Sequence, residues 1–303
     1  MKRPIAYKSI NELFIGVGYT SGPAIGGILY RVGGFHLPFT ITGSILLAMI
    51  IPVFFLLPPE ESFHNTSKNG NVRAKEDEEI GSLIQTLKVP GIFVISICIV
   101  SCGTILAFFD PTLTPYLLKI DPGITSEQIG LVFFMTSFLY VVGTPIVGAI
   151  CDKKISGRHL MIIGHFTTAL SYFLLGPSPL FQNFLKGSVL LVEISMCFIG
   201  FCAAFFCVPL LSDMQKSGKK SGLPQTIATD TLISGIFNGC FGIGCSIGPL
   251  LGSTLVDLWG FEWTATIMAL IITVEGLVLF FFTIWEKKYY SKMQGYTKIA
   301  EEA

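Results

Sequence analysis

Acidic side chains are the only charged groups inside the apolar stretches of this sequence. The acids that interrupt those stretches are Glu12, Asp110, Glu193, Asp230 and Glu275, whereas every lysine and arginine falls between the stretches. A carboxylate in apolar surroundings is costly, and where one is retained it usually serves a function. An interior with acids and no fixed base suits protons and organic cations, and it suits anions poorly.

Asp110 is the strongest candidate for chemistry because two prolines follow it, Pro111 directly and Pro115 one turn later. Proline removes a backbone N–H and disfavours helical angles in the residue before it. We therefore predict a bent helix with free carbonyl groups at Asp110, which is how transporters build ion sites within the membrane. The prediction is that Asp110 binds the substrate or a proton. The structural alternative is a carboxylate that a neighbouring hydroxyl satisfies.

Glu12 and Glu193 are the other candidates for substrate or proton binding. Glu12 follows Lys8 by one turn, so a structural ion pair is the alternative to proton transfer. Glu193 lies about two turns from one end of its stretch, where it can reach water. Glu275 is expected to be held neutral or packed, and Asp230 is expected to mark a helix start, where the helix dipole favours an acid.

The stretches that carry these acids are long enough to cross a membrane. The chain has 303 residues, of which 51% are hydrophobic and 13% charged. A membrane-spanning helix needs about 20 predominantly apolar residues. Eight stretches qualify: 9–30, 37–57, 91–117, 127–150, 159–177, 188–210, 226–256 and 263–284. We predict an all-α, multi-pass membrane protein with eight transmembrane helices in a lipid bilayer.

The basic residues between these stretches predict the orientation. Alternate loops hold 17 lysines and arginines on one side and 3 on the other. The basic side is expected to be cytoplasmic, so both termini face the cytoplasm. The glycosylation sequon at Asn65 then lies out of reach of modification. The net charge is zero, and no basic stripe indicates a nucleic-acid partner.

An internal repeat appears when the chain is shifted by 226 residues. Ten of 26 positions between 16–41 and 242–267 are identical, several of them glycines. Such repeats are typical of transporters built from two related halves. Glycines four residues apart let helices approach closely. The positions predicted to serve helix packing and conformational change are Gly18, Gly22, Pro23, Gly26, Gly244, Gly248, Pro249, Gly252 and the bend at Pro111.

The repeat also predicts the domain organisation. Residues 1–57 are expected to be the last two helices of an N-terminal half and 58–90 the cytoplasmic loop between halves. Residues 91–285 are then a six-helix C-terminal half, and 286–303 a cytoplasmic tail. Four helices precede the repeated pair in the second half and none in the first, so we expect a truncated chain lacking roughly 135 residues and four helices.

Signals for enzymes, cofactors and metals are absent. The glycines from Gly242 to Gly248 follow no predicted strand and make no dinucleotide fingerprint. The eight cysteines lack zinc spacing and histidine partners, and the four histidines form no cluster. The cysteines are therefore expected to be packing residues. We predict no enzyme activity, no cofactor and no metal site.

The repeated glycines resemble a known motif. Gly235, Gly244, Gly248-Pro249 and Gly252 are similar to the antiporter motif of the major facilitator superfamily, and the first copy has Ser9 in place of the leading glycine. A second superfamily motif is matched imperfectly between the fourth and fifth stretches. Its residues are Gly148, Asp152, Lys153, Gly157 and Arg158. The resemblance implies a cytoplasmic gate formed by Asp152, Lys153 and Arg158, with solvated loop charge as the alternative.

Segments 109–113, 130–133, 174–177 and 260–263 resemble the vesicular amine transporters of solute carrier family 18, and among them most closely the polyamine branch. The resemblance covers about residues 9–285. It implies the last eight helices of a twelve-helix fold, proton-coupled antiport of an organic cation, and an intracellular vesicle membrane. Ala204 and Asn238 stand where monoamine carriers have aspartates, which puts a monoamine substrate in doubt.

Two other functions remain open. A chain without half of the central cavity is expected to associate with a full-length transporter and not to transport by itself. A carrier of the same fold for an anionic or neutral solute is the second alternative, and the acidic interior disfavours it.

Overall fold

Helices make up the regular secondary structure that the computed structural model describes. It describes residues 18, 21–22, 25–56, 83–153, 156–179 and 187–302, without the side chains of 152, 227 and 290–302. The helices are α2 (His36–Leu56), α5 (Leu83–Leu87), α6 (Pro90–Ala107), α7 (Phe109–Ile120), α8 (Ser126–Asp152), α9 (Gly157–Leu175), α10 (Val189–Lys220) and α11 (Ile227–Glu302). Five helical stretches are long and apolar enough to cross a membrane. The predicted all-α membrane fold is confirmed.

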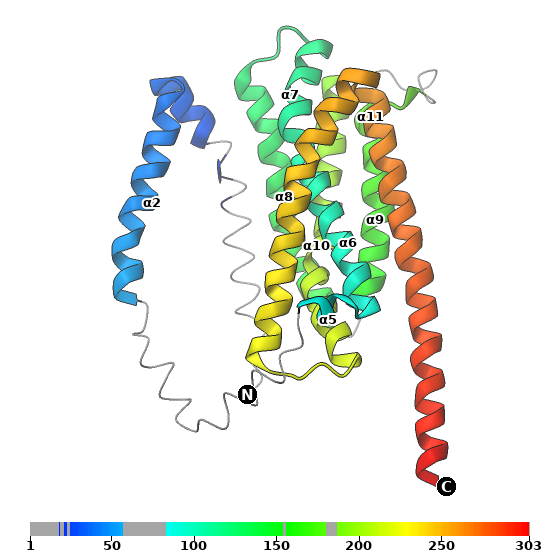
Figure 1. Ribbon diagram of the computed structural model, residues 1–303. Helices are drawn as coiled ribbons and strands as arrows, with labels where there is room; N and C mark the ends of the chain where they lie inside the picture. Colours follow the sequence, from blue (N-terminus) through cyan, green and yellow to red (C-terminus); the bar gives the residue numbers. More distant parts are fainter. Residues whose placement is uncertain are drawn as a thin grey trace.

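The last two predicted membrane crossings form the two arms of α11. Its apolar stretch, Ala228–Tyr289, has 62 residues. A straight helix of that length would measure roughly 93 Å, about three times the thickness of the hydrocarbon layer. Gly260 interrupts the helix with φ 80° and ψ 164°, and the second arm runs back beside the bundle (Figure 1). The break lies between the two predicted stretches.

Several helices extend beyond the predicted apolar stretches. The helix predicted over 188–210 continues as α10 to Lys220, and the predicted tail at 286–303 is helical to Glu302. Polar residues at a helix end do not stop a helix unless the backbone changes conformation. The end of α10 coincides with Gly222, whose φ of 84° is the left-handed angle that commonly terminates helices. The predicted loop 58–90 contains α5 in its last residues, and residues 57–82 lie outside the described chain.

The start of α8 follows from local sequence. Thr125 and Gln128 form a capping box, in which the Thr125 hydroxyl accepts from the Gln128 backbone N–H and the Gln128 side chain accepts from the Thr125 N–H. These two bonds satisfy backbone groups that the helix itself leaves free. The capping-box spacing in the sequence is thereby confirmed.

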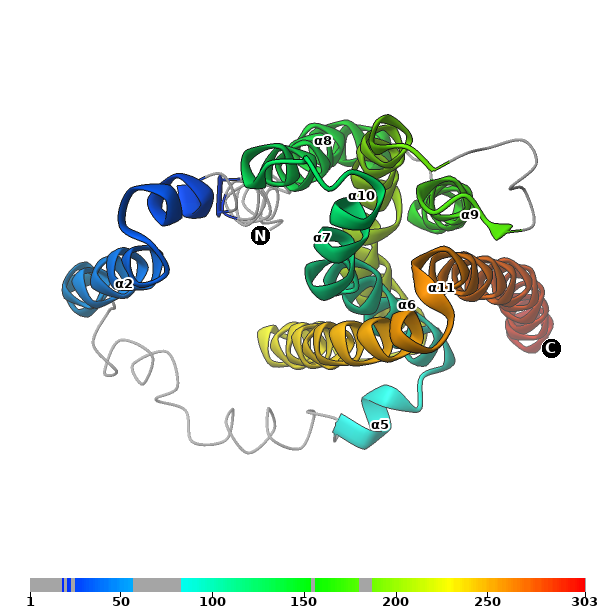
Figure 2. The same cartoon turned by 90° about the horizontal axis from the view of Figure 1, so that it is seen from above.

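The main apolar core joins all six helices from α6 to α11. Its largest fully buried side chains include Phe108, Tyr172 and Phe206. The most extensive packing is between α6 and α11 and between α10 and both α8 and α9. Viewed from above, α2 stands apart from this bundle (Figure 2). None of its 21 residues is buried, so this apolar helix is open along its whole length.

Candidate functional site

Asp110 lies at a helix break within the core bundle. Helix α6 ends at Ala107 and α7 begins at Phe109, so Asp110 is in the first turn of α7. Pro111 has no N–H to donate to the carbonyl of Ala107, four residues earlier, and this accounts for the interruption there. The interruption of the helical hydrogen bonds lies at Phe108, whose backbone keeps helical angles of φ −56° and ψ −37°, so the predicted bend stays a prediction.

The Asp110 carboxylate is exposed, although the helices on both sides of it are largely buried. It makes no hydrogen bond or ion pair with the residues that the structure describes. The neighbouring Phe108 and Phe109 are buried beneath it. Its place in the first turn of α7 is favourable for an acid, but that alone does not require an aspartate in an apolar stretch. The arrangement provides an open carboxylate that a cation or a proton can occupy.

No described contact places another of the predicted acids beside Asp110. Glu193 is half-buried in α10 and Asp230 is exposed in the first turn of α11. Glu275 is buried in the second arm of α11, beside His165 of α9. Glu12 lies outside the described residues. Of the acids predicted from the sequence that the structure describes, Asp110 alone is both exposed and next to a helix interruption; Asp257, also exposed, lies three residues before Gly260 in α11.

The second glycine copy lies against α6. A Cβ atom at Gly244 would come within 2.1 Å of the carbonyl oxygen of Val100, and one at Gly248 within 2.6 Å of that of Thr104. At Gly252 it would meet the Phe108 ring at 2.7 Å. Only glycine permits such an approach. These contacts hold α11 against α6, the helix that ends just before Asp110.

The first glycine copy has no such partner. A Cβ atom at Gly18, Gly22 or Gly26 would have no neighbour within 4 Å in the described structure. Pro23 lies outside the described residues, and Pro249 is half-buried in α11. The two copies therefore share sequence but not surroundings.

A buried ionic network joins α9, α10 and α11 at one end of the bundle. The Arg158 guanidinium, 3% exposed, donates to Asp213 at 2.6 Å and to Glu286 at 2.5 Å. It also donates to the Ser217 hydroxyl at 2.7 Å. Lys220 reaches Glu286 at 3.4 Å. Two carboxylates thus neutralise a buried arginine and a lysine, and they tie three helices together.

This network differs from the predicted gate. Arg158 was expected to act with Asp152 and Lys153, but its partners are Asp213, Ser217 and Glu286. Lys153 is exposed, and the side chain of Asp152 is outside the described structure. The expectation that every basic residue lies in a loop is also wrong, because Lys119, Arg158 and Lys220 lie in terminal turns of helices.

Asp213 and Glu286 were missed because the sequence placed them outside the membrane helices. Extending α10 to Lys220 puts Asp213 and Ser217 four residues apart, on one helical face. That spacing was a usable signal. Also missed was the meeting of Cys98, His165 and Glu275, whose ligand atoms lie within 4.8 Å of one another. The expectation that no cysteine has a histidine partner is therefore wrong for Cys98.

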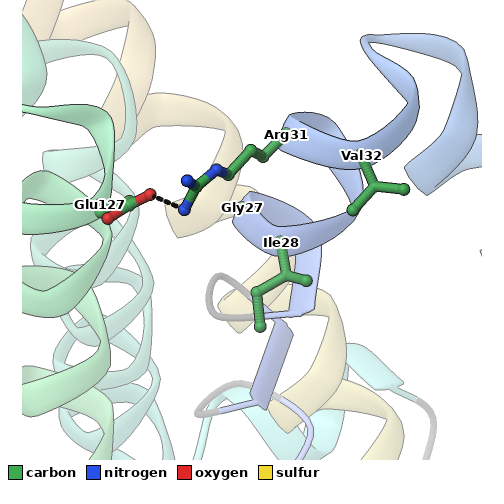
Figure 3. A pocket seen from close by; sticks show the side chains of 5 residues that line it. All are labelled: Gly27, Ile28, Arg31, Val32 and Glu127. Carbon is green, nitrogen blue, oxygen red and sulfur yellow. Dashed lines mark hydrogen bonds and ion pairs between the residues drawn. The ribbon is translucent and has the colours of Figure 1, made fainter.

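The described N-terminal segment touches the bundle through a charged contact. Arg31 pairs with Glu127 at the start of α8. Both side chains are exposed, and the apolar depression beside them is lined by Gly27, Ile28 and Val32 (Figure 3). Among the described residues that line it, Arg31 and Glu127 are the only polar ones, so this part of the depression offers little to a polar ligand.

Comparison with known proteins agrees with this architecture. A profile of the Major Facilitator Superfamily matches residues 2–234. The chain is 31% identical over 276 residues to the MFS-type transporter SLC18B1 of Rattus norvegicus, covering 91% of this chain and 57% of the relative. It is 29% identical over 294 residues to the protein of the same name in Homo sapiens, covering 96% and 61%.

A more distant relative is the synaptic vesicular amine transporter of Mus musculus, which is 25% identical over 270 residues, covering 88% of this chain and 47% of the relative. The chain therefore spans less than two thirds of the relatives that it matches. These relatives are transporters and not enzymes. With a profile match over most of its length and an all-helical membrane fold, the chain belongs to the major facilitator superfamily.

Proposed function

We propose that this chain forms the cation-binding half of a secondary transporter that exchanges protons for an organic cation, with Asp110 as the binding group. The observation that carries the proposal is the open Asp110 carboxylate at the α6–α7 break, which has no partner among the described residues. One carboxylate holds a proton or an ammonium group, but not both at once. That competition couples the two flows.

The substrate class is inferred from the names of the relatives and from the packing around Ala204. Relatives whose printed name includes "amine transporter" favour an amine. Ala204 is fully buried, and a Cβ atom at Gly143 would lie 2.9 Å from its methyl group. An aspartate at position 204, as in monoamine carriers, has no room there. A flexible polyamine, which carries several ammonium groups without an aromatic ring, fits this chain better than a monoamine.

The Arg158 network serves in this proposal as the gate at one end of the bundle. Its three helices include both the second arm of α11 and α10, which packs on α8 and α9. A buried arginine with two carboxylates is strongly held while the helix ends are together, and it can hydrate when they separate. The network thereby favours one of the two states of a transporter that opens alternately to each side.

Orientation and location complete the proposal. The network lies at the end of the bundle where the basic loops gather. The distribution of lysine and arginine assigns this end, with both termini, to the cytoplasm. The membrane in this proposal is that of an intracellular vesicle. Asn65 tests this assignment. A glycosidase-sensitive mass shift that Asn65→Gln removes would reverse the orientation, whereas an unmodified Asn65 in a glycosylating cell is the expected result.

Uptake into liposomes tests the role of Asp110. We expect the chain, reconstituted with a transport-inactive full-length relative when it is inactive alone, to accumulate labelled spermidine under an imposed proton gradient. Asp110→Asn keeps the size of the side chain and removes its exchangeable charge, so uptake should fall to background. Asp110→Glu should retain part of it. Asp230→Asn, an exposed acid in α11, is the matched control. Normal uptake and pH dependence in Asp110→Asn would refute the proposal.

A second candidate function is that of a partner that binds a full-length transporter and does not transport by itself. The open apolar face of α2 and the unoccupied glycines of the first copy favour it. Such a chain should co-purify with a full-length relative and slow its uptake. Gradient-driven spermidine uptake by the chain alone would exclude this candidate. Uptake of an organic anion or a neutral solute instead would overturn the cation proposal.

A further inference from the structure

Three side chains capable of binding a metal converge inside the bundle, away from the site just described. Cys98 comes from α6, His165 from α9 and Glu275 from the second arm of α11. Their residues are 1%, 0% and 9% exposed. Their ligand atoms, one from each side chain, all lie within 4.8 Å of one another.

The His165 ring is oriented so that one nitrogen is left for a ligand. Its Nδ1 lies 2.7 Å from the carbonyl oxygen of Met161. A carbonyl oxygen only accepts, so Nδ1 donates its hydrogen there, and Nε2 of the neutral ring carries a lone pair. That nitrogen faces the Glu275 carboxylate at 3.8 Å. Histidines that bind metals are oriented in this way, with the other ring nitrogen donating to a carbonyl or carboxylate.

The polar atoms that meet here are poorly satisfied. Nε2 of His165 and both carboxylate oxygens of Glu275 are buried and make no hydrogen bond within the described structure. The Ser101 hydroxyl and the Cys98 thiol are the described donors that approach the carboxylate. The Thr168 hydroxyl, one turn beyond His165, is likewise buried without a partner. Buried acceptors without a donor are costly, and a cation at their centre would satisfy several of them together.

The distance between His165 and Glu275 favours a metal ion over a shared hydrogen. A separation of 3.8 Å is too long for a hydrogen bond. Two ligands on one tetrahedral zinc ion, each about 2.0–2.3 Å from it, lie roughly 3.3–3.6 Å apart. A small adjustment of the three side chains therefore completes three positions of a zinc site.

Charge and ligand type point the same way. A thiolate and a carboxylate carry two negative charges, the imidazole is neutral, and one divalent cation brings the sum to zero. A neutral site is what a low-dielectric interior tolerates. Sulfur and imidazole ligands suit zinc and neighbouring transition metals, whereas magnesium and calcium prefer sites made of oxygen atoms. We infer that Cys98, His165 and Glu275 form a binding site for Zn²⁺ or a similar transition-metal ion.

Such an ion would bind three helices at once. It would fix α6, which leads into the break at Asp110, to α9 and to the second arm of α11. A ligand that binds only the folded chain raises its stability in proportion to its concentration and affinity. The inference does not depend on transport, and its test needs no transport assay.

Cobalt titration of the purified full chain in detergent micelles tests the site. Co²⁺ takes the ligands of zinc and adds absorption that reports a thiolate ligand and tetrahedral geometry. We expect one equivalent of Co²⁺ per chain, loss of the absorption when Zn²⁺ is added, and a higher melting temperature with Zn²⁺. Cys98→Ser should abolish the thiolate absorption. His165→Gln and Glu275→Gln should weaken binding by at least about tenfold.

Two matched controls should bind as the unaltered chain does. His159→Gln changes an exposed histidine of the same helix, and Cys240→Ser changes a cysteine of the first arm of α11. Helical circular dichroism identifies any variant that fails to fold, and the stoichiometry, spectrum and melting shift of the unaltered chain then decide. Absence of Co²⁺ absorption and of any zinc-dependent shift would overturn the inference and leave only protons at this cluster. Equal binding by folded variants would overturn it as well.

Discussion

The two glycine copies carry the same residues but do different things in this structure. In the second copy, Gly244 and Gly248 lie against the backbone of α6 and Gly252 lies against the Phe108 ring. Their equivalents Gly18, Gly22 and Gly26 have no neighbour in the described structure. Gly34 and Gly260, which correspond in the repeat, nevertheless share a positive φ, of 67° and 80°. The turn is a local property and appears in both copies. Close helix packing needs a partner, and only the second copy has one in the described structure.

The same contrast holds for charge. Arg158 is buried in the bundle between two carboxylates, whereas Arg31 joins the N-terminal segment to α8 through an exposed pair. Burial makes it costly to remove any member of the first group, because a charge is then left without its partner, and solvent screens the second pair. The bundle of α6 to α11 therefore has the interactions of a folded unit, and residues 25–56 have those of a segment attached to it.

The largest expected effect comes from filling the second glycine copy. Gly248→Leu places side-chain atoms where a Cβ alone would lie 2.6 Å from the Thr104 carbonyl oxygen. We expect a loss of at least about 3 kcal/mol in the free energy of unfolding, because backbone atoms cannot move aside easily. Gly22→Leu should change it by less than about 0.5 kcal/mol. Thermal unfolding in detergent, followed by circular dichroism, measures both.

An equal loss in Gly22→Leu would break the comparison, because the first copy would then also be packed. Gly248→Ala is the graded control, and its loss should be smaller than that of leucine. Adding a full-length relative sharpens the test. If the first copy packs on such a partner, Gly22→Leu should reduce co-purification without altering the stability of the chain alone.

Removing the buried arginine should have the next largest effect. Arg158→Ala leaves Asp213 and Glu286 buried without their cation, which costs about 3–5 kcal/mol. Arg31→Ala removes an exposed pair and should cost less than about 1 kcal/mol. Unfolding measured at low and at high salt separates them further, since only the Arg31 effect should shrink with salt. Similar losses in the two variants would mean that the end network is solvated.

The smallest expected loss of stability comes from replacing the turn glycines, and it should be similar in the two copies. Gly34→Ala and Gly260→Ala each force a side chain to a positive φ, at a cost of about 1–3 kcal/mol. The cost arises within one residue and does not require a partner. Helix content and unfolding midpoints of the two variants check it. A large loss at Gly260 with none at Gly34 would show that the turn in the first copy is not specified by its glycine.

Most of the helices follow from the sequence, because twenty apolar residues in a row specify a membrane helix whatever surrounds them. The interruption near Asp110 follows from Pro111, the start of α8 from Thr125 and Gln128, and the turn of α11 from Gly260, since each acts through its own backbone neighbours. The acidic character of the interior is equally a property of the sequence. These features required no knowledge of which helix lies beside which.

Contacts between distant segments were decided only by the tertiary structure. Arg158 meets Asp213 and Glu286, and Cys98 meets His165 and Glu275, because the bundle brings together helices that lie far apart in the chain. The glycine motif is similar in both copies. Only the tertiary structure shows that the second copy packs against α6, whereas the first has no neighbour among the described residues. Sequence periodicity specifies which face a residue occupies on its own helix. The helix that covers this face is set by the best packing of the whole bundle.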